Sequence, residues 1–202
     1  MKKRLIIVLL VSIIFLLSGC KKIENPIVTM EIENYGTIKI ELYPEYAPNT
    51  VANFVNLVQD GFYDDNNFHR LTPGFVLQGG DPDGIGSGGP GYTIRGEFKI
   101  NGYPNNTLSH TTGIVSMARR SDDYNSAGSQ FFIVLSDNAV PSLDNMYAGF
   151  GKVIEGMDII NNIANNAEIE DAESGKLKEN IKIVKATVDT KGETYKVNKM
   201  SS

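Results

Sequence analysis

Two short stretches carry most of the chemically useful side chains of this sequence. The first, at 68–81, reads FHRLTPGFVLQGGD, and the second, at 128–135, reads GSQFFIVL. Together they supply Arg70, Phe75, Val76, Gln78, Gln130 and Phe132. A guanidinium stays protonated and presents its donors in a rigid planar fork, so this set suits gripping a peptide and stabilising a distorted amide. It does not suit making a covalent bond to one.

Covalent and metal-dependent chemistry has little support. A serine nucleophile needs a base and an elbow such as G-x-S-x-G, and the sequence GSQ at 128–130 lacks the second glycine. His69 and His110 are the only histidines and Cys20 is the only cysteine, which makes a structural zinc site improbable. Counting residues leaves a Ser-His-Asp hydrolase open, but we favour a non-covalent site with no metal and no cofactor.

Two familiar patterns in the glycine-rich segment 81–92 are weak. The sequence GIGSGG at 84–89 matches the dinucleotide-binding spacing G-x-G-x-x-G, which should open a helix. Pro90 and another glycine follow where that helix should begin. Asp81 and Asp83 resemble the start of a calcium loop, but the third ligand and the closing glutamate are missing. The segment is therefore interpreted as a surface loop.

The elements that must position these side chains are short strands and two helices. Alternating apolar and polar residues at 28–32 and 37–42 are typical of half-buried strands, with a hairpin loop at 34–36. A helix is expected near Pro48, because proline suits the first helical position, with an apolar face over 51–58. Further strands are expected at 114–118, at 131–135 with both faces buried, at 147–154, and at 181–188 with a bulge, and a second helix is expected at 157–164.

Several long motifs occur together in one order. FHRLTPGFVLQGGD is followed by LSHTTGIVSMA at 108–118, by GSQFFI, and by SLDNMYAGFGKVIEGMDII at 142–160. In these motifs the sequence resembles the cyclophilins, the cyclosporin-binding family of peptidyl-prolyl isomerases, over residues 27–189. The resemblance implies a mainly β fold, a closed eight-stranded antiparallel β-barrel capped by two α-helices.

The resemblance also implies an activity and its residues. The barrier to rotation about a peptide bond, roughly 18–20 kcal/mol, is lost amide resonance, and the prolyl nitrogen of a twisted X-Pro amide becomes a hydrogen-bond acceptor. A donor on Arg70 would bind this state better than the planar one, as catalysis requires. The expected catalytic residues are Arg70, Phe75 and Gln78, and the expected substrate contacts are His69, Val76, Ala118, Arg119, Gln130, Phe132, Leu143 and Tyr147.

Two positions qualify this interpretation. His69 is also interpreted as a hydrogen-bonded core histidine. Ser142 stands where many cyclophilins carry tryptophan, and the chain has no tryptophan, so cyclosporin binding is expected to be weakened.

The alternative function is a membrane-anchored chaperone or scaffold that binds proline-containing polypeptides without significant turnover. Arg70 favours the enzyme, because a pure binder needs no donor aimed at the prolyl nitrogen.

The amino end has the three parts of an export signal. A basic start is followed by an apolar run at 5–17 and by Leu-Ser-Gly-Cys ending at Cys20. This order resembles the lipobox of bacterial lipoproteins and implies a signal peptide at 1–19, lipid attachment to Cys20 and a tether at 20–26. The protein is therefore expected on a cell membrane, facing outside the cytoplasm, where it would assist the folding of exported proteins. A plain membrane anchor is the alternative.

Length and charge limit what the processed chain could be. Removing residues 1–19 leaves 183 residues, enough for one domain with tails. The three basic residues at 2–4 are lost with them, so 16 basic residues remain against 24 acidic ones, a net charge of −8. An acidic chain argues against nucleic acid as a partner, because nucleic-acid-binding surfaces are usually basic. Residues 165–180 are expected to form a polar linker and residues 190–202 a flexible tail.

Overall fold

A computed structural model describes residues 24–201 of the chain. The strands are β1 (Ile27–Ile32), β2 (Gly36–Leu42), β3 (Asn66–Thr72), β4 (Val76–Asp81), β5 (Ile114–Met117), β6 (Phe131–Val134), β7 (Gly149–Glu155), β8 (Ile169–Asp171) and β9 (Lys176–Asp189). The helices are α2 (Pro48–Gln59), α3 (Val140–Leu143) and α4 (Met157–Asn166), with 3-10 turns at Lys99–Asn101 and Asp137–Ala139.

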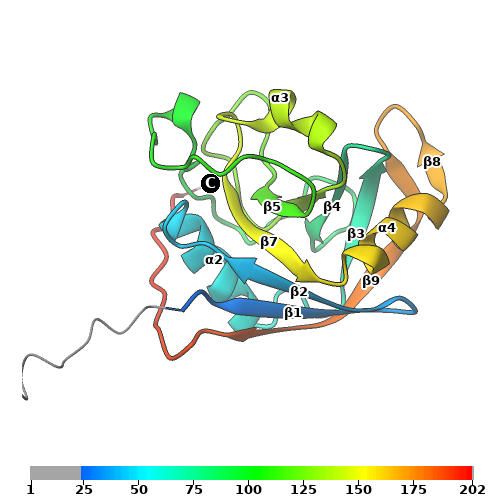
Figure 1. The fold of residues 1–202 in the computed structure, drawn as a ribbon, viewed down its shortest axis with the longest axis horizontal. Coiled ribbons are helices and arrows are strands. Elements are labelled where there is room, and N and C mark those ends of the chain that lie inside the picture. The colour runs from blue at the N-terminus through cyan, green and yellow to red at the C-terminus, as the bar shows by residue number, and fades with distance from the viewer. Residues whose placement is uncertain (1–23, 202) are drawn as a thin grey trace, which may run out of the picture.

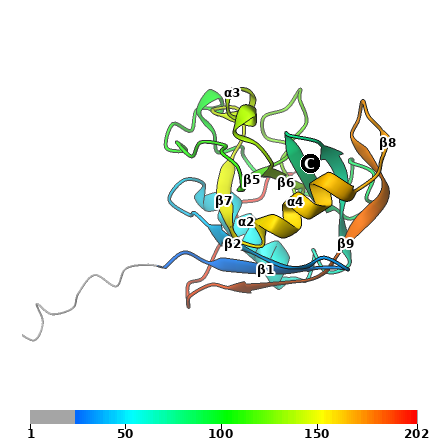
Figure 2. The ribbon, with the colours of Figure 1, turned by 45° about the vertical axis from the view of Figure 1, so that its right-hand side comes forward.

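Eight of the strands close into a barrel. They are hydrogen-bonded in the order β1-β2-β7-β5-β6-β4-β3-β9, and β9 pairs back onto β1, with every pairing antiparallel. Figure 1 shows α2 on one side of this barrel and α4 on the other, and Figure 2 shows α4 lying across it. The structure thus confirms a mainly β fold with an eight-stranded barrel and two capping helices. The short α3 is an addition to that prediction.

The closing strand contains the predicted bulge. On β1, Glu31 pairs with Lys185 and Ile32 with Ile183, so Val184 has no partner in this register. An extra residue of this kind switches the face on which alternate side chains lie. Ile183 and Ala186 can therefore both belong to the buried core.

Helix α2 begins at Pro48 as expected, but a distant residue completes its first turn. Ala47 offers no side-chain cap. Instead, the carboxylate of Glu97 accepts hydrogen bonds from the backbone N–H groups of Asn49 at 3.1 Å and Thr50 at 2.8 Å. A negative charge at a helix N-terminus satisfies free donors and complements the helix dipole. On the apolar face, Phe54 packs inside the barrel, with its ring 5.4 Å from that of Phe131.

Two of the expected irregular segments are ordered differently. The polar linker predicted at 165–180 contains the end of α4, strand β8 and the start of β9. Strand β8 pairs only with β9 among the described residues, and three residues are too few to show a period in sequence. The tail predicted to be flexible lies against the domain as far as Met200, which forms a β-bridge with Thr93.

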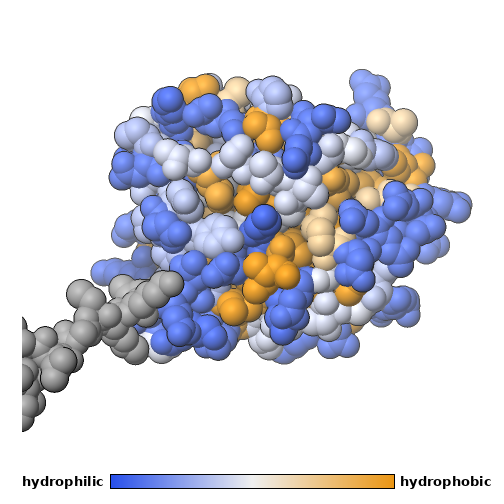
Figure 3. Space-filling model, in the orientation of Figure 1, coloured by the Kyte–Doolittle hydropathy of each residue, from blue (hydrophilic) through white to orange (hydrophobic). Residues whose placement is uncertain are grey.

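The surface and the termini add two observations. On the face shown in Figure 3, hydrophobic residues form small groups between hydrophilic ones. Among residues 24–201, no helix has the length and apolar character needed to cross a membrane. The predicted signal peptide and Cys20 lie outside the described residues.

Candidate active site

Four side chains form a row across four neighbouring strands. Arg70 on β3 pairs with Gln78 on β4, Gln78 pairs with Phe132 on β6, and Phe132 pairs with Ser116 on β5. Directly opposed residues of antiparallel strands share one face of the sheet. The neighbours Leu77, Phe131 and Ile133 belong to the main core inside the barrel. The row therefore lies on the outer face, and residues far apart in sequence meet in one site.

An irregularity in β3 puts Arg70 on this face. Phe68 pairs with Gly79 and Arg70 with Gln78, so His69 has no partner in the register. In a regular strand Phe68 and Arg70 would share a face, but the irregularity reverses the phase, with Phe68 buried in the main core. His69 itself is 4% exposed, and neither ring nitrogen has a hydrogen-bond partner among the described residues. The prediction of a hydrogen-bonded histidine is therefore wrong.

Two acceptors hold the guanidinium of Arg70. Its Nη1 donates to Oε1 of Gln78 at 3.1 Å, and its Nε donates to the carbonyl oxygen of Ser174 at 2.8 Å. Gln78 in turn donates from Nε2 to Oε1 of Gln130 at 2.9 Å, and Gln130 donates to the carbonyl of Gly88 at 2.9 Å. The Nη2 of Arg70 has no partner within residues 24–201 and is free to donate to a ligand. Partial burial lowers the pKa of Arg70, and the group remains a cation.

An apolar cluster lies beside this chain of amides. Its buried members are Val76, Ile114, Phe132, Val134, Ala139 and Leu143, and Phe75, Leu108, Ala118 and Tyr147 pack against it from more exposed positions. The ring of Tyr147 meets that of Phe132 edge to face at 5.6 Å. A partly exposed apolar surface next to a charged donor can hold a hydrocarbon ring and an amide together.

A relay of hydrogen bonds with a buried histidine and a buried serine supports the apolar cluster. The ring of His110 is hydrogen-bonded through Nδ1 to Asp144 at 2.9 Å and through Nε2 to Ser116 at 3.0 Å, and it stacks on Phe132. These are the residue types of a hydrolytic triad. Ser116, however, is 0% exposed, so its hydroxyl cannot reach a substrate. The relay is structural, which removes the hydrolase alternative for this serine.

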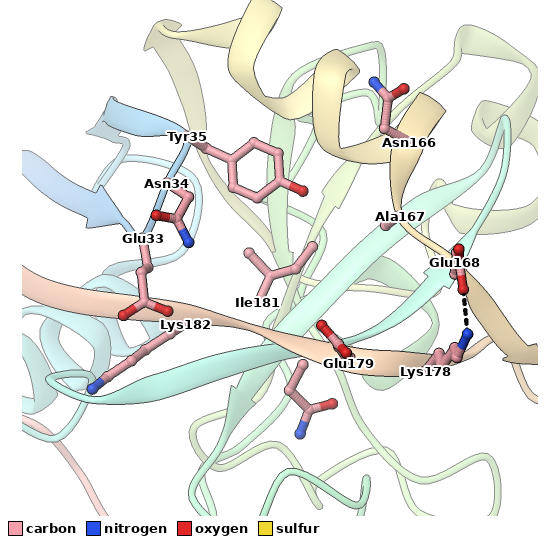
Figure 4. Close-up of a pocket in the computed structure, with 11 residues that line it drawn as sticks. Glu33, Asn34, Tyr35, Asn166, Ala167, Glu168, Lys178, Glu179, Ile181 and Lys182 are labelled. Atoms are coloured by element: carbon pink, nitrogen blue, oxygen red, sulfur yellow. Dashed lines mark hydrogen bonds and ion pairs between the residues drawn. The ribbon is translucent and has the colours of Figure 1, made fainter.

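Two hollows in the surface differ in their chemistry. One, of about 510 Å³, adjoins the amide chain and is lined by Gln78, residues 86–93, Ala118, Arg119, Arg120, Ser126 and residues 128–130. The other, of about 640 Å³, lies between the β1–β2 hairpin, the end of α4 and β9. Figure 4 shows Tyr35 and Ile181 pointing into it, with the ion pair of Glu168 and Lys178 at its rim. Of these two hollows, only the first adjoins the amide chain that holds Arg70.

Comparison with known proteins identifies the family of this chain. Residues 27–188 match the family described as cyclophilin type peptidyl-prolyl cis-trans isomerase/CLD. The chain belongs to the cyclophilin family. It is 47% identical to peptidyl-prolyl cis-trans isomerase B of Bacillus subtilis over 134 residues, which is 66% of this chain and 87% of the relative. A Synechococcus elongatus peptidyl-prolyl cis-trans isomerase is 45% identical over 136 residues, 66% of this chain and 86% of the relative.

A solved structure extends the likeness to the whole barrel. A Cryptosporidium parvum cyclophilin, crystallised in the presence of the dipeptide Ala-Pro, superposes with a TM-score of 0.70 at 35% identity and covers 81% of this chain and 98% of its own. Together with the family match and the curated relatives, this likeness shows that the present chain is a peptidyl-prolyl cis-trans isomerase.

The structure brings most of the predicted site residues together. Arg70, Phe75, Val76, Gln78, Ala118, Gln130, Phe132, Leu143 and Tyr147 lie in the amide chain or in the apolar cluster. Arg119 is held in place, because its guanidinium lies 4.6 Å from the ring centroid of Tyr147 and 4.8 Å from that of Tyr124 and donates to the carbonyl of Met146. Its contact with substrate stays a prediction, as does weaker cyclosporin binding at the exposed Ser142. His69 is too buried to touch a bound peptide.

Sequence reasoning missed the residues that act behind the site. The carbonyl of Ser174 is a backbone group, so no side-chain motif marks it. The relay of Ser116, His110 and Asp144 left a faint signal, since His110 and Asp144 each fall within a motif quoted above. Their meeting depends on the barrel, which places β5 and the segment after α3 together.

Both histidines should make the fold sensitive to mild acid. Burial lowers the pKa of His69 and of His110 below the ordinary 6.5, although Asp81 and Asp144 oppose the shift. The unfolded chain then binds protons that the folded chain refuses, so stability present above pH 6.5 is lost as the pH falls below it. We expect the free energy of unfolding, measured in urea, to fall between pH 6.5 and 5, by at most about 1.4 kcal/mol per pH unit for each histidine.

Replacing His69 by phenylalanine separates the two contributions. This variant should keep only the part of the slope that His110 causes, because an apolar ring in the same site binds no proton. An unchanged slope in His69→Phe would show that His69 does not titrate differently on folding.

Proposed function

We propose that Arg70 catalyses isomerisation by donating a hydrogen bond from Nη2 to the prolyl nitrogen of a twisted X-Pro amide. The supporting observation is the position of its guanidinium, which Gln78 and Ser174 fix beside the apolar cluster while Nη2 stays free. The nitrogen accepts well only when resonance is lost, so the bond stabilises the transition state more than the ground state. A donor already in place needs no reorganisation during the reaction.

The proline ring would lie against Phe75, Val76, Phe132 and Leu143, which supply the apolar wall of the site. Gln78 would orient Arg70 and meet a carbonyl of the peptide, since its remaining amide N–H group is a donor. The path involves no covalent intermediate and no cofactor. The chain's own residues bind, orient and polarise the amide, which then rotates about its C–N bond.

We further propose that the protein works outside the cytoplasm, anchored by lipid at Cys20, on exported polypeptides. The sequence of the first twenty residues supports this proposal. Several acyl chains on one terminus anchor stably, whereas a single chain binds only marginally. An X-Pro bond left to itself isomerises over tens to hundreds of seconds, slow enough for an anchored catalyst to help newly exported chains.

Replacing Cys20 by serine tests the anchor and the activity together. Wild-type protein is expected in the membrane fraction, released by detergent but not by salt. It should also accelerate refolding of an exported protein that is limited by X-Pro isomerisation. Cys20→Ser should lose lipid labelling but keep the acceleration, and Lys22→Ala should keep both. Normal lipid labelling of Cys20→Ser would refute the anchor, and unaccelerated refolding with the wild type would refute the role in folding.

A further inference from the structure

The chain continues past the part that matches the cyclophilin family, and the extra residues are attached to the domain. The match ends at residue 188. We call residues 190–201 the strap. The strap turns away from β9 at Lys191 and Gly192, whose φ angles are +57° and +84°, and the N–H of Glu193 closes the turn on the carbonyl of Thr190 at 3.1 Å.

The strap is fastened to α2 as far as Asn198. Asn56 donates from its side chain to the carbonyl of Tyr195 at 2.9 Å. The side chain of Asn49 both donates to the carbonyl of Asn198 at 3.1 Å and accepts from its N–H at 2.7 Å, which imitates a strand partner. Tyr195 and Val197 pack against the main core. The strap therefore has defined contacts along its length.

The end of the strap reaches the hollow beside the active site. Met200 donates to the carbonyl of Thr93 at 2.8 Å and accepts from the N–H of Thr93 at 3.2 Å. The Nζ of Lys199 lies 4.1 Å from the ring centroid of Tyr92, within the range of a cation–π contact. Tyr92 and Thr93 both line the hollow of about 510 Å³ next to Gln78 and Gln130.

The wall of the hollow that the strap touches is tied on both sides, by Gly86 to Asp81, by Gly88 to Gln130 and, just beyond it, by Ile94 to Ala127. Between these points it has few contacts of its own. The segment 86–93 reads GSGGPGYT, and glycines lose more conformational entropy than other residues when they become ordered. Within residues 24–201, the backbone of residues 89–92 makes no hydrogen bond. The side chain of Tyr92 donates to Asn53 at 2.8 Å. The two backbone hydrogen bonds with Met200 therefore attach this wall to the domain at Thr93.

We propose that the strap is a positioning element that holds this wall in place, so that the hollow is formed before a peptide arrives. The hollow then accepts a residue that flanks the proline while the proline itself lies on the apolar cluster. Beside Pro90, Tyr92, Arg119 and Arg120, its lining consists mainly of glycine, serine and amide groups, which suit a peptide backbone and a small or polar side chain. A preformed wall avoids an ordering cost on binding. The strap would thus favour extended proline peptides over minimal ones.

The shorter of the two hydrogen bonds in the bridge to Thr93 can be removed without touching the site. Met200→Pro lacks the N–H that donates to Thr93, whereas Met200→Ala keeps it and is the matched control. We expect Met200→Pro to raise KM about 3–10-fold for a blocked hexapeptide with a central Ala-Pro, since ordering costs of this size accompany binding. KM for a blocked Ala-Pro dipeptide, and kcat for both peptides in exchange NMR, should stay within about twofold, because a dipeptide does not reach the wall and gains nothing from its being ordered beforehand.

A second variant guards against misfolding. Truncation after Asn198 removes Lys199 and the bridge but leaves the packing of Tyr195 and Val197, and it should show the same selective loss. Met200→Ala should behave as the wild type. Equal loss for both peptides in Met200→Pro and in the truncation would show a merely structural strap, and unchanged KM values for both would show no role in binding. Either result overturns the proposal.

Discussion

Replacing Arg70 by alanine is expected to slow X-Pro isomerisation by roughly 10²–10³-fold, the typical effect of losing one preorganised donor. The loss should fall mainly on kcat, because the donated bond is strongest at the twisted amide. Peptide affinity should fall less, since Phe75, Phe132 and Leu143 still hold the proline ring. Exchange NMR on a proline peptide measures both quantities.

Conservative and distant replacements make this result specific. Arg70→Lys should recover only part of the rate. A flexible ammonium cannot donate to Gln78, to Ser174 and to the substrate at once, as the planar guanidinium does. Arg95→Ala, at an exposed arginine that contacts only the carbonyl of Asn101 among its hydrogen-bond partners in the described chain, should leave the rate unchanged. A folded Arg70→Ala protein that works at the wild-type rate would refute the proposed mechanism.

Replacing Gly80 by alanine should destabilise the fold by about 2–5 kcal/mol. The φ angle of Gly80 is +86°, and an added Cβ would lie 2.5 Å from the carbonyl oxygen of Ser129 and 3.2 Å from Cα of Gln130. Left-handed backbone costs an alanine about 1–2 kcal/mol, and overpacking adds about 1–3 kcal/mol. A shift of Gln130 would also weaken its hydrogen bond with Gln78, so kcat should fall with stability.

Gly74 provides the control for the backbone contribution. Its φ angle is +68°, but an added Cβ would meet no atom within 4 Å. Gly74→Ala should therefore cost only the conformational part, about 1–2 kcal/mol. Urea unfolding of both variants measures the difference. Equal destabilisation of the two would contradict the close approach of Gly80 to the Ser129–Gln130 backbone.

The sequence by itself determined the family, the barrel and most of the residues of the site. Arg70, Gln78, Gln130 and Phe132 lie in motifs long enough to be recognised without a structure. The start of α2 at Pro48 and the alternation in β1 and β2 were also predictable. For α2 and these two strands the cause is local, since the fixed φ angle of proline and a period of two can be read from neighbouring residues.

Only the tertiary structure decided how these residues act. The irregularity at His69, which turns Arg70 outward, depends on the register with β4. The carbonyl that fixes Arg70 belongs to Ser174, 104 residues away. His110, just before β5, meets Asp144, between β6 and β7, because β5 lies between those two strands in the sheet. The last residues look like a polar tail in sequence because they contain no apolar period of their own. Their partners are side chains of α2 and the backbone of Thr93, which lie far away along the chain. Contacts of this kind join distant segments, and no local pattern records them.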